Sequence, residues 1–156
     1  MVDLKNLVDI SLLQGFQDNF SLSAGFSCLT EDSLGNALTC PSHFSDCCLN
    51  IIRKSKQGAK RCRNCDLMGA EDAIRNGKPA IYQCHAGLID FAVPIIVEGK
   101  QIGTIYGGQV LAKPPNEEKF RKIALEMGVN PDEYVAAIKK IPVLPEKIIH
   151  AAASLV

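Results

Sequence analysis

The sequence predicts an α+β domain in which helices pack on an antiparallel sheet. Apolar residues recur at helical spacing near both ends of the chain, which predicts helices there. Short runs rich in Val, Ile, Tyr and Phe, broken by glycines, fill residues 79–111 and predict strands. Tight turns between these runs favour hairpins, whose strands pair antiparallel. Helices set apart from such hairpins are typical of the α+β class.

The first half of the chain predicts helices on either side of one β-hairpin. Residues 2–20 place their apolar side chains along one helical stripe. Turn-forming residues at 32–36 separate two short apolar runs, which predicts the hairpin. A later helical pattern ends at Asn76-Gly77, with Pro79 just beyond, as helices often do. The predicted elements are a helix at 2–20, strands at 24–31 and 37–40, and helices at 44–55 and 60–76.

The second half of the chain predicts three strands followed by three helices. Glu98-Gly99-Lys100 is a tight turn between two apolar runs, so the last two strands are expected to form a hairpin. Residues 91–97 are apolar throughout, which predicts a strand covered on both faces. Pro94 lacks a backbone donor and indicates a sheet edge or a bulge. The predicted elements are strands at 79–84, 89–97 and 101–111, and helices at 117–127, 131–140 and from 145 onward.

Length and charge restrict the class of protein. A chain of 156 residues suits one domain, 1–156, with a core of ordinary size. Its 17 basic and 17 acidic residues cancel, whereas nucleic-acid-binding proteins usually carry a positive excess, so no direct nucleic-acid contact is expected. No apolar run approaches the ~20 residues of a membrane span, and the N-terminus lacks a secretory signal pattern. The sequence therefore predicts a cytoplasmic protein without a membrane span.

The last helical pattern, from Pro145 to Val156, contains no residue that commonly ends a helix. One interpretation is that the helix simply ends there. We favour the other, in which this helix leads into an output domain that is absent from the sequence.

Six of the seven cysteines lie between Cys40 and Cys84. In intracellular proteins, clustered cysteines are more often metal ligands or redox groups than disulfides. Cys62 and Cys65 lie three residues apart, so on a helix both sulfurs can approach one centre. We predict a four-thiolate site that takes zinc or an iron–sulfur cluster, which the sequence does not distinguish. Its predicted ligands are Cys48, Cys62, Cys65 and Cys84, with Cys47 and His85 as competing ligands.

Other interpretations of the cysteines are structural or catalytic. Free cysteines are often buried as small apolar residues, which we expect for Cys28 and Cys40. A catalytic Cys–His pair needs hydrogen-bond contact. Cys84 and His85 are adjacent on a predicted strand and should point to opposite faces, which argues against that pair. A thiol enzyme is thus the least favoured hypothesis, and we predict that the chain is not an enzyme.

A second group of polar residues lies on the predicted strands. Three glycines interrupt the apolar strand at 101–111, where glycine often marks a bulge or the close approach of a ligand. A few polar groups among apolar neighbours are typical of a small-molecule site. The predicted ligand-binding residues are Tyr82, Asp90, Tyr106 and Gln109. The alternative is structural: the tyrosines pack in the core, the glycines form a bulge, and Asp90 faces water.

Several motifs of the chain occur together in one known family. They are Tyr82-Gln83-Cys84-His85-Ala86-Gly87-Leu88-Ile89-Asp90, Pro94-Ile95, Ile102-Gly103 and Gly107-Gly108-Gln109-Val110, with Phe44, Cys48, Gly58, Cys62 and Asp66 upstream. With these motifs the chain resembles the PocR sensory domain over roughly residues 12–111. The resemblance implies a PAS-like module with a five-stranded antiparallel sheet, which senses short alcohols, diols or similar hydrocarbon derivatives without catalysis. It also implies a homodimer attached to a kinase or transcription-factor output. The alternative function is a metal- or iron–sulfur-based redox sensor that uses the four predicted cysteine ligands.

Overall fold

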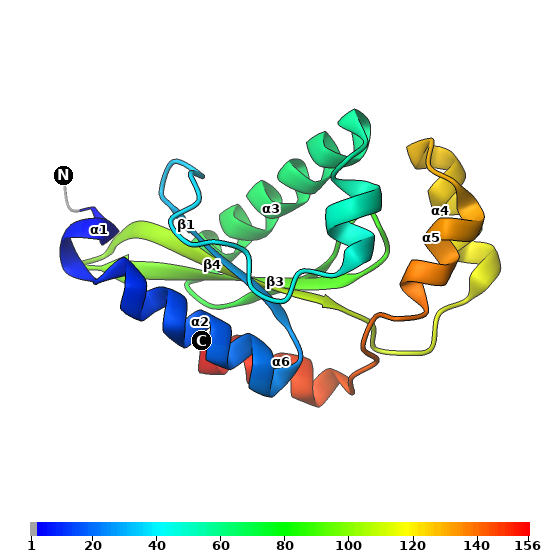
Figure 1. Cartoon of the computed structure of the whole chain (residues 1–156). Helices are drawn as coiled ribbons and strands as arrows, with labels where there is room; N and C mark the ends of the chain where they lie inside the picture. Colours follow the sequence, from blue (N-terminus) through cyan, green and yellow to red (C-terminus); the bar gives the residue numbers. More distant parts are fainter. Residues whose placement is uncertain (1–2) are drawn as a thin grey trace.

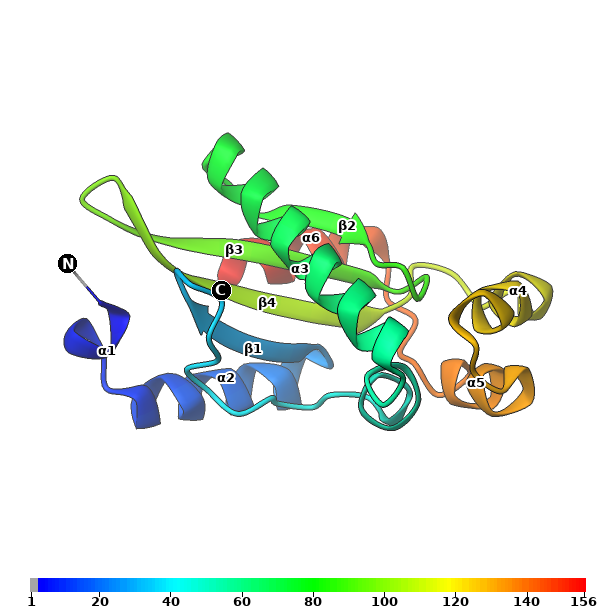
Figure 2. The same cartoon turned by 90° about the horizontal axis from the view of Figure 1, so that it is seen from above.

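A twisted antiparallel sheet with helices on both faces forms the centre of the protein (Figures 1 and 2). The computed structural model describes residues 3–156. Helix α3 crosses one face of the sheet, α2 and α6 lie on the other, and α4 and α5 form a hairpin beyond the strand ends. The elements are α1 (Leu4–Leu7), α2 (Ile10–Ala24), β1 (Ser27–Asp32), the π-helix η1 (Cys47–Ile52), α3 (Lys56–Asn76), β2 (Ala80–Gln83), β3 (Ile89–Val97), β4 (Lys100–Val110), α4 (Glu117–Met127), α5 (Pro131–Ile138) and α6 (Glu146–Leu155).

The sheet confirms the predicted α+β class but has fewer strands than expected. Within residues 3–156 it contains four strands in the order β1-β4-β3-β2, and every neighbouring pair is antiparallel. The fifth strand, expected at 37–40, is not formed. Residues 37–42 run beside β1 and meet it at two isolated bridges, Glu31 with Ala37 and Cys28 with Ser42, and through the Leu38 N–H, which donates to the Thr30 carbonyl.

Side chains of α2 explain why this segment does not complete the sheet. Gln14 Oε1 accepts a hydrogen bond from the Cys40 N–H at 2.8 Å, and Gln17 Nε2 donates to the Cys40 carbonyl at 2.9 Å. Gln17 Oε1 also accepts from the hydroxyls of Thr30 and Thr39. These backbone groups therefore bond to a helix rather than to a neighbouring strand, and the network fastens α2 to β1.

The helices of the structure differ from the predicted ones mainly in where they begin and end. The helix expected at 2–20 is divided, because the Asp9 carboxylate accepts from the Ser11 N–H and starts a new helix at Ile10. The helix expected at 44–55 is reduced to the π-helix η1. Helix α3 starts four residues earlier than expected, capped by Ser55, and ends as predicted at Gly77, whose φ is +61°.

Strand β3 is covered less than its apolar sequence predicts. Phe91 and Ala92 are buried, but Ile96 is 46% exposed, and the far end of the β3–β4 hairpin extends past the end of α3 (Figure 2). Pro94 pairs with β4 on one side only, since β2 ends its pairing at Ala92. The predicted sheet edge at Pro94 is therefore present locally.

Two hydrophobic clusters lie on different sides of the sheet region. One joins η1 to the α4–α5 hairpin, and the buried Tyr134 hydroxyl there donates to the Ala86 carbonyl at 2.6 Å. The other joins α2 and α6 to the sheet through Phe20, Phe91 and Ile149. None of the helices within 3–156 combines the length and the apolar character needed to cross a membrane.

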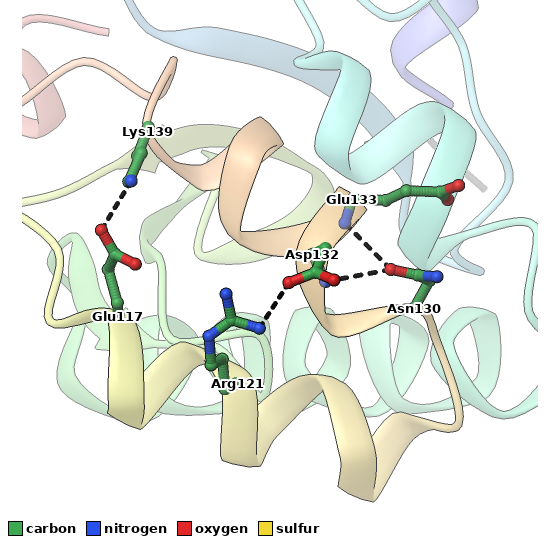
Figure 3. A network of polar contacts seen from close by, with 6 residues as sticks. All are labelled: Glu117, Arg121, Asn130, Asp132, Glu133 and Lys139. Atoms are coloured by element: carbon green, nitrogen blue, oxygen red, sulfur yellow. Dashed lines mark hydrogen bonds and ion pairs between the residues drawn. The ribbon is translucent and has the colours of Figure 1, made fainter.

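Surface polar contacts join α4 to α5 (Figure 3). Lys139 pairs with Glu117 and Arg121 pairs with Asp132, each at 2.6 Å. Asn130 Oδ1 accepts from the N–H groups of Asp132 and Glu133 and so caps α5. Because these ion pairs are largely exposed, the cap and the buried cluster beneath should stabilise the hairpin more than the ion pairs do.

Candidate functional site

A small cavity lies on the α3 face of the sheet. Its volume is about 30 Å³. All four residues predicted to bind a ligand line it, namely Tyr82, Asp90, Tyr106 and Gln109. They come from three strands, and the register places Tyr82 directly opposite Asp90. The other lining residues are Ser27, Leu29, Phe44, Arg53, Asp66 and Gly107.

A bulge between β3 and β4 positions Asp90 and Gln109. The pairing jumps from Ile89 to Phe91, which leaves Asp90 opposite the Gly108–Gln109 pair. Asp90 Oδ1 accepts from the Gln109 N–H at 2.8 Å, and Gln109 Oε1 accepts from the Ser45 N–H at 2.7 Å. Gln109 has φ +57°, a left-handed conformation that is uncommon for a residue other than glycine. Asp90 thus faces the cavity and the bulge rather than open water.

Gly108 is required by this arrangement. Its φ is +145°, and a Cβ there would lie 2.3 Å from Asp90 Oδ1. A side chain at this position would displace the Asp90 carboxyl from the bulge. The Gly-Gly-Gln motif is therefore explained by the shape of the backbone around Asp90.

The cavity contains two carboxyl groups and one guanidinium. Arg53 Nη2 lies 3.5 Å from Asp66 Oδ2, and the Arg53 guanidinium lies over the Phe44 ring, 5.3 Å from its centroid. Burial raises the pKa of Asp66 to about 7, with a further rise from the nearby Asp90 carboxyl and an opposing effect of Arg53. Burial also raises the pKa of Asp90, against the hydrogen bond from Gln109. The site can therefore offer both protonated and ionised carboxyls near neutral pH.

Tyr82 brings a hydroxyl without a protein partner. This oxygen is buried and, within residues 3–156, makes no hydrogen bond. An unpaired buried hydroxyl costs free energy, so a ligand that bonded to it would recover a lost hydrogen bond. Burial raises the pKa of Tyr82, so the phenol stays protonated and can donate.

Helix α3 accommodates the Tyr82 ring at Gly69. A Cβ on Gly69 would lie 2.2 Å from Tyr82 Cε1. Glycine inside a helix costs roughly 0.5–1 kcal/mol relative to alanine, so its presence there needs a packing reason. The close approach of the tyrosine ring supplies that reason.

The predicted metal ligands lie near one another but do not form a recognisable metal centre. Cys62 Sγ lies 3.2 Å from His85 Nε2, and Cys65 Sγ accepts from the His85 N–H at 3.4 Å. Cys48 belongs to the hydrophobic cluster around η1, and Cys62 and Cys84 pack against it. Across residues 3–156, no group of three or more His, Cys, Asp or Glu side chains is arranged to hold a metal ion. The four-thiolate site stays a prediction.

Burial keeps most of these thiols protonated. It raises the pKa of Cys62 to about 11 and that of Cys48 to about 12. Cys84 contacts the Asp90 carboxyl, and burial raises its pKa well above the ordinary range. Cys28 is buried as expected, but Cys40 is exposed, because its segment does not join the sheet.

Two residues that line the cavity, Arg53 and Asp66, were not among the predicted ligand-binding residues, although Asp66 is one of the residues that carry the family resemblance. His85, predicted as a competing metal ligand, contacts Cys62. Asp66 carried a usable signal, since it shares a helix face with the small residues Gly69 and Ala73, where a carboxyl is unexpected. Arg53 carried none, because its position depends on the π-helix before it.

Sequence similarity relates the chain to known proteins. The family model described as "Sensory domain found in PocR" matches residues 6–156. The regulatory protein PocR of Salmonella typhimurium strain LT2 is 30% identical over 99 residues, which are 64% of this chain and 32% of that protein. The chain thus spans about a third of the length of that relative. None of the solved structures matches it. The chain belongs to the PocR sensory-domain family.

Proposed function

We propose that this domain binds a small hydroxylated molecule, such as a short alcohol or diol, in the cavity on the α3 face of the sheet. The observation that carries the proposal is the convergence of Tyr82, Asp90, Tyr106 and Gln109 on one cavity. The sensory role of the family supports it. The domain would act without catalysis, as a sensor in a cytoplasmic signalling protein.

The chemistry of the cavity suits hydroxyl groups. The Tyr82 hydroxyl can donate, and the Asp66 and Asp90 carboxyls can accept or, when protonated, donate. A hydroxyl group both donates and accepts, so it can satisfy a pair of such groups at once. Leu29 and Phe44 supply apolar surface for a short carbon chain. A diol has two hydroxyls and matches this mixture better than a purely apolar molecule does.

Residues next to the cavity connect it to the last helix. Asp90 and Gln109 face the cavity, while their neighbours Phe91 and Val110 pack in the cluster that contains Ile149 of α6. Successive strand residues point to opposite faces, so a shift at the bulge would move both faces together. We propose that ligand binding favours one packing of α6 and thereby biases an attached kinase or transcription-factor output. A homodimer through the terminal helices would relay the change to both outputs.

Calorimetric titration with two- and three-carbon alcohols and diols tests the proposal. Wild-type protein should bind at least one of them, and saturating ligand should raise the unfolding temperature. Tyr82→Phe should weaken binding by about 2- to 13-fold, because a net hydrogen bond contributes roughly 0.5–1.5 kcal/mol.

Tyr134→Phe is the matched control. It removes a buried tyrosine hydroxyl that bonds to Ala86 outside the cavity, so it should change stability but not affinity. If no alcohol or diol binds the wild type, or if both variants weaken binding equally, the cavity is not the site.

A second candidate function is redox or metal sensing through Cys48, Cys62, Cys65 and Cys84. The observation that favours it is the contact of Cys62 with His85, beside Cys65. Zinc or an iron–sulfur cluster would be the cofactor. Metal analysis and an absorption spectrum of anaerobically purified protein test it. If the purified protein contains neither zinc nor iron, this function is excluded.

A further inference from the structure

A second, wider space adjoins the cavity on the same side of the sheet. This groove has a volume of about 350 Å³ and lies between the C-terminal half of α3 and β2. Its walls include Cys65, Met68, Arg75 and Gln83. By contrast, the cavity of about 30 Å³ has room on the order of two water-sized groups, since each needs about 10–15 Å³.

Tyr82 separates the two spaces. It is the single residue, among those the structure describes, that lines both the cavity and the groove. Its ring fits against α3 where Gly69 lacks a side chain. Its hydroxyl makes no hydrogen bond, so the ring is held by packing alone. Tyr82 also belongs to β2, a four-residue strand at the sheet edge.

We infer that the Tyr82 ring sets the maximum chain length of the ligand by closing the cavity against the groove. This inference rests on the function proposed above, because it concerns the same cavity. The limited room behind the ring favours the shortest diols, of two or three carbons, over longer ones. Longer chains would have to pass into the groove, and the ring stands in their way.

The groove offers apolar surface for an alkyl chain once the ring is absent, beside the charged Glu71, Asp72 and Arg75. Met68 and Cys65 offer polarisable, apolar side chains there, and Met68 is 70% exposed and free to adjust. A linear 1,2-diol could then keep its hydroxyls near Asp66 and Asp90 while its chain lies along Met68.

A chain-length series tests the inference. Binding of 1,2-diols with two to six carbons is measured by calorimetry for the wild type and for Tyr82→Ala. Wild-type affinity should fall beyond three carbons. Affinity of Tyr82→Ala should instead rise about fourfold with each added methylene, the factor that corresponds to burial of one such group. Tyr82→Phe keeps the ring and should retain the wild-type length limit.

Two further variants make the result specific. Met68→Ala, added to Tyr82→Ala, should reduce the gain for six-carbon diols and leave two-carbon binding unchanged. Tyr82→Leu keeps an apolar side chain against Gly69 and replaces Tyr82→Ala if the alanine variant does not fold. Like the alanine variant, it should extend the maximum chain length of the ligand. Folding of each variant is checked by circular dichroism.

The outcomes separate this inference from the function on which it rests. If the wild type binds short diols but Tyr82→Ala and Tyr82→Leu keep its length limit, the role of Tyr82 is refuted and the proposed function stands. Equal wild-type affinity for three- and six-carbon diols also refutes that role. If neither wild type nor variants bind any diol, both proposals fail.

Discussion

Asp66 should make the stability of the domain depend on pH, and Asp66→Asn should remove that dependence. The Asp66 carboxyl is held in the cavity, where its side chain is 22% exposed, beside the second carboxyl of Asp90. Burial and this neighbour disfavour the ionised form more than Arg53 favours it. Asparagine has nearly the same shape but cannot ionise.

The size of the effect follows from the pKa shift. A rise from 3.8 to about 7 corresponds to roughly 4 kcal/mol, since one pKa unit is about 1.4 kcal/mol. Because the folded pKa is the higher one, the folded state binds the proton more tightly. Below about pH 4 the carboxyl is protonated in both states and costs nothing. Stability then falls as pH rises, by at most about 1.4 kcal/mol per unit, and the full cost is present above about pH 7.

Urea unfolding at pH 4, 6 and 8 measures this dependence. The free energy of unfolding of Asp66→Asn minus that of the wild type should increase by roughly 3–4 kcal/mol from pH 4 to pH 8. Glu71→Gln changes an exposed carboxyl of the same helix, and its difference from wild type should vary by less than about 0.5 kcal/mol. A difference for Asp66→Asn that stays constant, or that decreases with pH, would refute a raised pKa of the Asp66 carboxyl.

Two further predictions concern stability. Asn130→Ala removes the cap of α5 and should lower the free energy of unfolding in urea by about 0.5–2 kcal/mol. Lys139→Ala breaks an exposed ion pair and should lower it by at most about 1 kcal/mol. A larger loss for Lys139→Ala than for Asn130→Ala would contradict the conclusion that the cap stabilises the hairpin more than the ion pair. Gln17→Leu leaves the buried Thr30 and Thr39 hydroxyls without their acceptor and should lower the free energy of unfolding by roughly 2–4 kcal/mol. Amide hydrogen exchange along β1 should become faster. Unchanged exchange there would show that the network does not hold α2 to the sheet.

The sequence was sufficient where local patterns decide the structure. The end of α3 at Gly77, the β3–β4 hairpin and the three helices after residue 113 follow from glycine placement, turn residues and helical periodicity. The convergence of Tyr82, Asp90, Tyr106 and Gln109 on one cavity was also foreseen as a site, because strand residues around a glycine-rich bulge are brought together by pairing alone. Their role as ligand contacts awaits measurement.

Long-range contacts account for most of the differences. The segment 37–40 has the composition of a strand, but the backbone N–H and carbonyl of Cys40 bond to Gln14 and Gln17, more than twenty residues earlier. Strand alternation predicted that the His85 side chain points away from the face on which Cys84 lies. Residues 84–88 instead form a turn after β2, which brings the His85 ring to Cys62 on α3. Neither contact is visible in local periodicity, since each depends on how distant elements pack.

The strand order has a consequence for how the chain folds. Strand β1 pairs with β4, so Ser27 lies opposite Gly108, while the local pair β3–β4 is closed by a short turn. Formation of the hairpin needs little loop-closure entropy, whereas docking of β1 must close a loop of about eighty residues. During synthesis, β1 should therefore remain without its strand partner until β4 emerges, held meanwhile by α2 and by the bridges to residues 37–42. We expect this docking to limit the folding rate, and its contacts to be the last formed on the folding pathway.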